Sequence, residues 1–265
     1  MFSIIQGFFV HSIYQSIQLK NMDISDVKPY NQEEDKTRQL NRMFNTISRQ
    51  YDKFNDIMSL GLARRWRKKA LLALKPYRHD RILDLAAGTA DICIKAFDYL
   101  TPEHVTGIDI SEKMLEIGEK KLAAAGLSEK VSLQVEDVSK MSFADASFDA
   151  ATTSFGIRNF EKLDQSLQEI HRVLKPSGKF IILEMSEPQT PVIKQAYLLY
   201  TKTLIPFAVK TFANDPKAYS YLTNSMSAFP QGDNFITILK KNGFNCLKYR
   251  TFFLGVCSLY VAEKK

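Results

Sequence analysis

The stretch of sequence that decides the fold is Arg81-Ile82-Leu83-Asp84-Leu85-Ala86-Ala87-Gly88-Thr89-Ala90-Asp91. It begins as an apolar strand and runs into a turn of small residues, which lets the backbone pass close to a bound ligand. Backbone amides at the start of the next helix point at such a ligand. A second predicted strand, residues 104–110, carries Asp109, whose carboxylate can accept hydrogen bonds from both hydroxyls of a ribose. Together the two strands predict a pocket for a nucleotide-type cofactor.

The turn lacks the second and third glycines of a G-x-G-x-x-G motif. A pyrophosphate therefore fits poorly, which argues against NAD and favours a cofactor without phosphates, with S-adenosylmethionine as the obvious candidate. We place Asp84 and Gly88 among the cofactor-binding residues. The alternative is a tight β-α turn in which Asp109 serves only as a helix cap before Ser111.

The composition fits a single α/β domain, because 265 residues with 45% hydrophobic content can bury a full core. The cysteines, Cys93, Cys246 and Cys257, lie far apart without a C-x-x-C, and the histidines have no metal-ligand spacing. We therefore predict no disulfide framework, no metal and a reducing, cytoplasmic location.

A formal charge of +7 is spread along the chain, and its densest cluster is Arg64-Arg65-Trp66-Arg67-Lys68-Lys69. On a helix this cluster would surround the axis with positive charge, which could meet anionic lipid or nucleic acid. No zinc spacing, aromatic-rich basic stripe or nucleic-acid motif accompanies it. We therefore predict no nucleic-acid partner and hypothesise peripheral contact with a membrane, with a solvated helix face as an equal alternative.

The first residues, 1–21, are apolar but interrupted by polar side chains. They offer neither the run of about 20 apolar residues that a membrane span needs nor the basic start and cleavage site of a signal peptide. We expect residues 1–35 to form a disordered extension, with a native start at Met22 as the plain interpretation and an interfacial anchor as the alternative. Residues 36–265 are predicted to form one domain.

Strand and helix patterns alternate along this domain. The predicted strands are residues 81–86, 104–110, 130–136, 148–155 and 178–185, followed by 246–251 and 256–262, which can pair antiparallel. Such alternation predicts a doubly wound, mostly parallel, seven-stranded Rossmann-like α/β sheet with ligands at the carboxyl ends of its strands.

Two further segments are predicted to cover the pocket. From Lys36 the apolar positions repeat at three and four, which predicts a helix with one buried stripe that includes Tyr51, within a helical lid over residues 36–75. Residues 186–235 form an insert rich in apolar side chains, with Pro206 kinking or dividing its helix. Such an insert suits a lipophilic substrate, and ordinary core packing explains it about as well.

Two motifs narrow the choice of protein family: Tyr51-Asp52-Lys53-Phe54-Asn55 and Ser154-Phe155-Gly156-Ile157-Arg158-Asn159. With them, from about Met43 to Ala262, the chain resembles the quinone-ring C-methyltransferases of menaquinone and ubiquinone biosynthesis, within the class I S-adenosylmethionine-dependent methyltransferases. The resemblance implies that Thr89, Asp109, Asp137, Val138 and Ser154 contact S-adenosylmethionine.

The chain departs from the pattern of that family at three places. Ala90 stands where the family usually has glycine, Ser177 replaces the first glycine of Pro-Gly-Gly, and Leu254-Gly255-Val256 through Tyr260 replaces a Gly-Gly-Ile ending in histidine. The third departure leaves the contacts near the substrate end open.

Methylation of a quinol ring carbon needs a proton acceptor and alignment of the reacting atoms. Arg158 and Asn159, directly after a strand, are our candidates for holding the phenolate or orienting a water, with arginine as a polariser and not the base. Tyr51 is a further candidate. The structural alternatives are a clamp of Arg158 on a carboxylate and a purely packing role for Tyr51.

The resemblance implies methyl transfer to a prenylated quinol, and we favour demethylmenaquinol. The alternatives are a demethylated ubiquinol precursor, and an O- or N-methyltransferase for small molecules with the same fold. A nonenzymatic cofactor-binding subunit is a third hypothesis, and a homodimer stays open.

Overall fold

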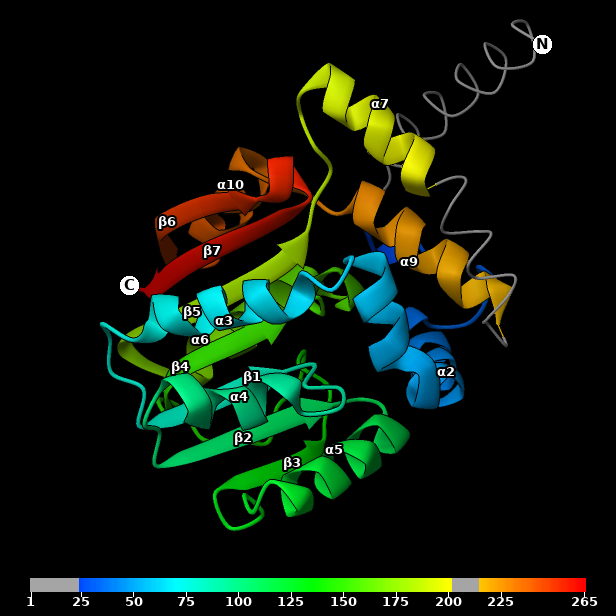
Figure 1. Ribbon diagram of the computed structural model, residues 1–265. Coiled ribbons are helices and arrows are strands. Elements are labelled where there is room, and N and C mark those ends of the chain that lie inside the picture. The colour runs from blue at the N-terminus through cyan, green and yellow to red at the C-terminus, as the bar shows by residue number, and fades with distance from the viewer. Residues whose placement is uncertain (1–23, 202–214) are drawn as a thin grey trace, which may run out of the picture.

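A computed structural model describes residues 24–201 and 215–265, apart from the side chains of Phe54, Ile57, Met58, Leu198 and Tyr219. Its centre is a seven-stranded sheet with the order β3-β2-β1-β4-β5-β7-β6 (Figure 1). β7 runs in the direction opposite to that of the other six strands. The strands are β1 (Arg81–Leu85), β2 (His104–Asp109), β3 (Val131–Val135), β4 (Phe148–Ser154), β5 (Leu174–Met185), β6 (Phe244–Phe252) and β7 (Cys257–Lys264). The predicted doubly wound, mostly parallel sheet is confirmed.

Helices cover both faces of the sheet (Figure 1). Their bounds are α2 (Lys36–Met58), α3 (Ala63–Leu74), α4 (Asp91–Tyr99), α5 (Glu112–Ala124), α6 (Leu163–Val173), α7 (Pro191–Leu199), α9 (Pro216–Ala228) and α10 (Asp233–Lys241), with short 3₁₀ turns η1 (Ile24–Asp26), η2 (Ile157–Asn159) and η4 (Phe253–Gly255). α3 and α4 pack on one face, α6 and α10 on the other.

The central strands β4, β5 and β7 are buried along most of their length, whereas the edge strands β3 and β6 are partly exposed. Along β5, Ile181 and Leu183 belong to the core beneath α3 and α4, whereas Phe180 and Ile182 belong to the core beneath α6 and α10. Successive side chains of a strand point to opposite faces, so a continuous apolar run feeds two cores at once.

The chain reverses its direction of winding between β1 and β4, which are parallel neighbours. From β1 the chain moves outward to β2 and β3, and it then returns to place β4 and β5 on the other side. Open α/β sheets bind ligands at the carboxyl ends of the strands at such a switch point. The small-residue turn after β1 lies there.

Two boundaries differ from the sequence-based expectation. β5, predicted to begin at residue 178, begins at Leu174, and the register of its pairing with β4 shifts between Phe148 and Ala150. Residues 24–35, expected to belong to a disordered extension, are ordered, because Ile24 and Val27 are buried in the core beside α2. Residues 1–23 and the predicted kink at Pro206 lie outside the described residues.

All three departures from the family pattern fall on left-handed backbone. The φ angles are 62° at Ala90, 59° at Ser177 and 59° at Leu254. A side chain with a Cβ atom is disfavoured in this region and glycine is not, which explains why the family usually has glycine there. This chain adopts the same backbone with strained residues.

Ser177→Gly is therefore expected to stabilise the fold. Ser177 is exposed, so the substitution removes little packing, and relief of left-handed strain exceeds the added entropy of the unfolded chain. The free energy of unfolding in urea should rise by about 0.5–1 kcal/mol. Ser177→Ala keeps the Cβ atom and should give no such gain; an equal gain in both variants would show that strain is not the cause.

Candidate active site

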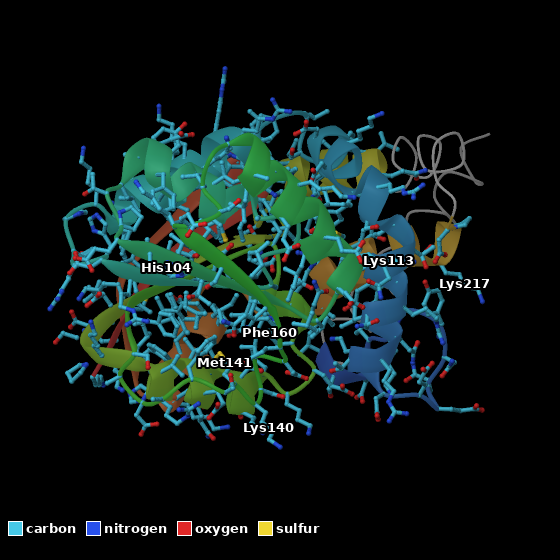
Figure 2. All side chains as sticks on the ribbon, turned by 90° about the horizontal axis from the view of Figure 1, so that it is seen from below. His104, Lys113, Lys140, Met141, Phe160 and Lys217 are labelled. Atoms are coloured by element: carbon cyan, nitrogen blue, oxygen red, sulfur yellow. The ribbon has the colours of Figure 1, made fainter. Side chains whose placement is uncertain are left out.

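A cleft, here called the cofactor cleft, lies at the switch point between β1 and β4. Its lining residues come from α2, from the ends of β1, β2 and β4, from α5 and from the segments after β3 and β4: Thr37, Phe44, Tyr51, Ala86, Gly88, Asp109, Ile110, Met114, Glu136, Asp137, Val138, Ser154, Phe155, Gly156, Asn159, Phe160 and Glu161. Seen from below, Phe160 lies within the body of the molecule, whereas Lys140 lies at its edge (Figure 2).

Asp109 is oriented by two backbone amides. Its carboxylate oxygens accept hydrogen bonds from the amide of Gly88, at 2.8 Å, and from the amide of Ser111, at 2.8 Å. Burial raises the pKa of this carboxyl, and the amide hydrogen bonds oppose that effect. The amide of Ser111 links Asp109 to the start of α5, but the helix cap itself is Ser111, whose hydroxyl accepts from the amide of Met114. Asp109 is therefore not the residue that caps α5.

The small residues let two segments meet closely above the cleft. A Cβ atom added at Gly156 would lie 2.6 Å from the Cβ of Ala86. The turn after β1 is itself left-handed at Ala86, Gly88 and Ala90. Ala86 and Gly156 both line the cleft, so this part of its wall is made by small residues.

The structure brings most of the predicted cofactor residues together. Gly88, Asp109, Asp137, Val138 and Ser154 all line the cleft. Two others do not. The hydroxyl of Thr89 donates to Asp52 of α2, at 2.9 Å, and accepts from Lys121 of α5.

Asp84 lies within β1 and is buried behind the turn. Its carboxylate accepts from the hydroxyl of Thr152, at 2.6 Å, and lies 3.5 Å from the thiol of Cys93. Burial raises its pKa to about 7. Asp84 therefore supports the turn from below and does not line the cofactor cleft.

Arg158 is buried and paired. A guanidinium nitrogen lies 2.5 Å from a carboxylate oxygen of Glu184, and it also donates to the carbonyl of Phe155. Burial alone would lower the pKa of Arg158, but Glu184 offsets this and the pKa is raised, so the guanidinium keeps its charge. The expected alternative of a clamp on a carboxylate is thus present. The guanidinium Nε is buried and has no hydrogen-bond partner within the described residues.

A second space, here called the inner cavity, lies next to the cofactor cleft. It is lined by Asn55, Ser59, Ala63, Phe155, Arg158, Met185, Leu222 and Met226. Phe155 lines both spaces, so the two spaces share a wall. Asn159 faces the cofactor cleft and accepts a hydrogen bond from the hydroxyl of Tyr221, at 3.0 Å.

Tyr51 lines the cofactor cleft from α2 and packs edge-on against Phe44. Burial raises the pKa of its phenol. The phenol therefore stays protonated near neutral pH and can donate a hydrogen bond but cannot serve as a base.

Sequence reasoning missed the network that joins the lid to the turn. Lys121 pairs with Asp52 of α2 at 2.7 Å and with Asp91 at 2.9 Å. Arg67 pairs with Asp91 at 3.0 Å and donates to the hydroxyl of Ser154. The expectation that the basic cluster surrounds its helix with surface charge is wrong at Arg67, because that side chain is 8% exposed and points into the site.

Within residues 24–201 and 215–265, no three metal-binding side chains come together. In the same part of the chain, each helix is too short or too polar to cross a bilayer.

The residues of the cleft fit S-adenosylmethionine. The carboxylate of Asp109 is held open toward the cleft for ribose hydroxyls, and Asp137 stands beside apolar Val138 and Met114, which suits a purine ring with an exocyclic amino group. The order of the strands, the cleft at the switch point and the carboxylate at the end of β2 are the features of a Rossmann-like methyltransferase of class I. The chain belongs to the ubiE/COQ5 methyltransferase family, whose profile matches residues 31–264. The predicted family, the enzyme class and S-adenosylmethionine as methyl donor are confirmed.

Individual relatives agree with this membership. A protein of Bacteroides fragilis named demethylmenaquinone methyltransferase is 44% identical over 238 residues, which cover 90% of this chain and 97% of the relative. A protein of Geotalea daltonii named ubiquinone/menaquinone biosynthesis C-methyltransferase UbiE is 37% identical, with 87% of this chain and 98% of the relative covered. A solved SAM-dependent methyltransferase from Aquifex aeolicus, 16% identical, superposes with a TM-score of 0.55 over 75% of this chain and 89% of that one and shows the shared fold.

The raised pKa of Asp84 predicts a pH-dependent stability effect. The folded state keeps the proton up to about pH 7, whereas the unfolded state loses it near pH 4. The wild type therefore loses stability from this group as the pH rises through that window, by a total of roughly 2–4 kcal/mol. Asp84→Asn removes the titration, so its free energy of unfolding should rise relative to that of the wild type between pH 4 and 7.

Urea unfolding at several pH values measures this difference. Asp98→Asn, at an exposed position of α4, is the matched control. If the free energies of unfolding of Asp84→Asn and the wild type differ by the same amount throughout pH 4 to 7, the raised pKa of Asp84 is contradicted.

Proposed function

We propose that the protein transfers the methyl group of S-adenosylmethionine to a ring carbon of demethylmenaquinol, a prenylated quinol. The name and the 44% identity of the Bacteroides fragilis relative support this acceptor over a demethylated ubiquinol precursor, which is the alternative. The observation that carries the proposal is the buried Nε–H of Arg158, which has no partner among residues 24–201 and 215–265 and lies in a cavity that shares a wall with the cofactor cleft. A buried donor without a partner is costly, and a ring oxygen would satisfy it.

The chain's own residues would position and activate the ring. Arg158 stays charged, so it can stabilise the negative charge that develops on the quinol oxygen as its proton leaves. Asn159, fixed by Tyr221, and the neutral phenol of Tyr51 can orient a water that takes this proton. After the methyl group has bonded to the ring carbon, that carbon loses its hydrogen as a proton and the oxygen regains one, so the reaction releases one proton overall. S-adenosylmethionine supplies an electrophilic methyl group when it is bound.

The cofactor roles follow the geometry of the cleft. Asp109 would accept the ribose hydroxyls, Asp137 and Val138 would hold the adenine, and Gly88 and Ser154 would border the cofactor. The hydroxyl of Thr89 can donate a hydrogen bond to the cofactor only after it has given up its hydrogen bond to Asp52. Asp84 would act by supporting the turn.

Methyl transfer from radiolabelled S-adenosylmethionine tests the function. Label should enter reduced demethylmenaquinone, and Asp109→Ala should be blank because the ribose contact is lost. Asn159→Ala should lower kcat by about 100-fold to 1000-fold, as expected for loss of an oriented polar group, while the affinity for S-adenosylmethionine stays within about twofold.

Parallel assays separate the alternatives. Label in the demethylated ubiquinone precursor alone would establish the other acceptor. Cofactor binding with label in neither quinol would favour an O- or N-methyltransferase or a nonenzymatic subunit, and in the latter case Asn159→Ala and Arg158→Ala would change nothing measurable.

We also propose peripheral contact with an anionic membrane, while a homodimer stays a prediction. Arg65 and Lys69, one turn apart on α3, are exposed, and the Nζ of Lys69 lies 4.8 Å from the ring of Phe252. Next to Phe252, η4 exposes Phe253 and Leu254 to 53% and 67%. Basic side chains beside exposed apolar ones are the composition that membrane-surface binding needs.

Co-flotation with anionic liposomes checks the membrane contact. Each basic side chain near such a surface contributes about 1 kcal/mol, so Arg65→Glu with Lys69→Glu should lower the bound fraction by about tenfold or more. Lys120→Glu with Lys140→Glu makes the same charge change near β3, at the opposite edge of the sheet, and should leave binding nearly unchanged. Flotation of the wild type no better than that of an unrelated soluble protein would contradict the contact.

A further inference from the structure

A third space, here called the apolar cavity, lies beyond the inner cavity. It is formed by α7, the start of α3 and η4, and its lining is almost entirely carbon: Ser59, Leu60, Trp66, Ile193, Ala196, Tyr197, Tyr200, Phe253, Leu254 and Val256. α7 stands at the upper side of the molecule in Figure 1, beside the end of the β6–β7 hairpin. None of these residues has a role in the chemistry proposed above.

The three spaces follow one another through shared walls. Phe155 lines the cofactor cleft and the inner cavity, and Ser59 lines the inner cavity and the apolar cavity. Polarity falls along this series, from the carboxylates around Asp109 to the single buried guanidinium of Arg158 and then to hydrocarbon. A ligand that spans the series would be polar at one end and apolar at the other.

Tyr197 is a side chain of the third space on which Arg158, in the wall of the second space, acts electrostatically. Its ring lines the apolar cavity, while its hydroxyl is buried and has no hydrogen-bond partner in the described part of the chain. The positive charge of Arg158 acts on this phenol. A buried hydroxyl without a partner indicates a ligand group that would satisfy it.

The outer rim of the apolar cavity is held in a disfavoured backbone conformation. Phe253 and Leu254 have φ angles of 47° and 59°, and their side chains are largely exposed. Neither left-handed backbone nor exposure of a large apolar side chain stabilises a folded monomer, so the combination points to a function of this loop.

We propose that the apolar cavity binds the polyprenyl tail of the substrate. The tail leaves the inner cavity past Ser59, lies between Trp66 and Ala196, and reaches the surface between Leu60 and Leu254. The hydroxyl of Tyr197 donates to a ring oxygen at the boundary. This assignment rests on the proposed function, because it requires a prenylated quinol whose ring occupies the inner cavity.

Trp66 offers a direct measurement of binding, since it is the chain's single tryptophan and lies in the wall of the apolar cavity. Titration of the wild-type protein with geranylgeraniol, a polyprenyl chain without a ring, should change the Trp66 emission in a saturable way. Ala196→Phe fills the cavity and should abolish the change. Gln195→Phe adds the same ring at the neighbouring position of α7, which does not line the cavity, and should leave the change intact.

Turnover gives the second readout. The wild type should prefer a demethylmenaquinol with a long tail over the same naphthoquinol without a tail, and Ala196→Phe should reduce this preference in kcat/KM by about tenfold or more. Gln195→Phe should retain the preference.

The two readouts distinguish the ways in which the proposal can fail. An equal loss on both substrates in Ala196→Phe, or no loss on either, would overturn the tail site, as would a Trp66 emission that does not respond to geranylgeraniol. If the wild type methylates neither quinol, the proposed function itself is wrong, whatever the Trp66 titration shows.

Discussion

The ion pair between Arg158 and Glu184 is the interaction on which the arrangement of the site depends. Removing two charges from water is costly, and attraction offsets that cost only when the remaining hydrogen-bonding groups are satisfied. Here the carbonyl of Phe155 accepts from the guanidinium, and the amides of Arg158 and Met185 donate to the carboxylate. The pair therefore joins the segment after β4 firmly to the end of β5, and the buried Nε–H of Arg158 has no partner among the described residues.

The segment held in this way also anchors the elements that cover the site. The ammonium of Lys36, at the start of α2, contacts the carbonyl of Arg158, and Tyr221 of α9 donates to Asn159. Farther along α2, Asp52 bonds to Thr89 in the turn after β1. The lid, the insert and the sheet thus meet at one short stretch of chain. Phe155 in this stretch has a φ angle of 63°, and such left-handed backbone is supported by the rigid sheet and by neighbouring helices, not by its own local preference.

The sequence predicted what depends on local patterns and missed what depends on distant partners. Apolar runs located the strands to within a few residues, since the buried part of a parallel sheet requires them. The place of Asp109 in the wall of the cleft could be predicted because it ends a parallel strand. Arg67 could not be placed, because in sequence it is one of several basic residues and only Asp91, on another helix, makes its burial favourable. Ile24 was likewise misplaced, since only the folded core shows that its apolar side chain has somewhere to pack.

The close approach of Gly156 to Ala86 has a consequence for how such a chain can vary. The 2.6 Å between an added Cβ at Gly156 and the existing Cβ of Ala86 leaves room for one methyl group across the two positions together. A side chain gained at one position must be matched by its loss at the other, although seventy residues separate them in sequence. Homologous chains can therefore exchange which of the two carries the methyl group, but the paired substitutions must arise together or pass through glycine at both sites.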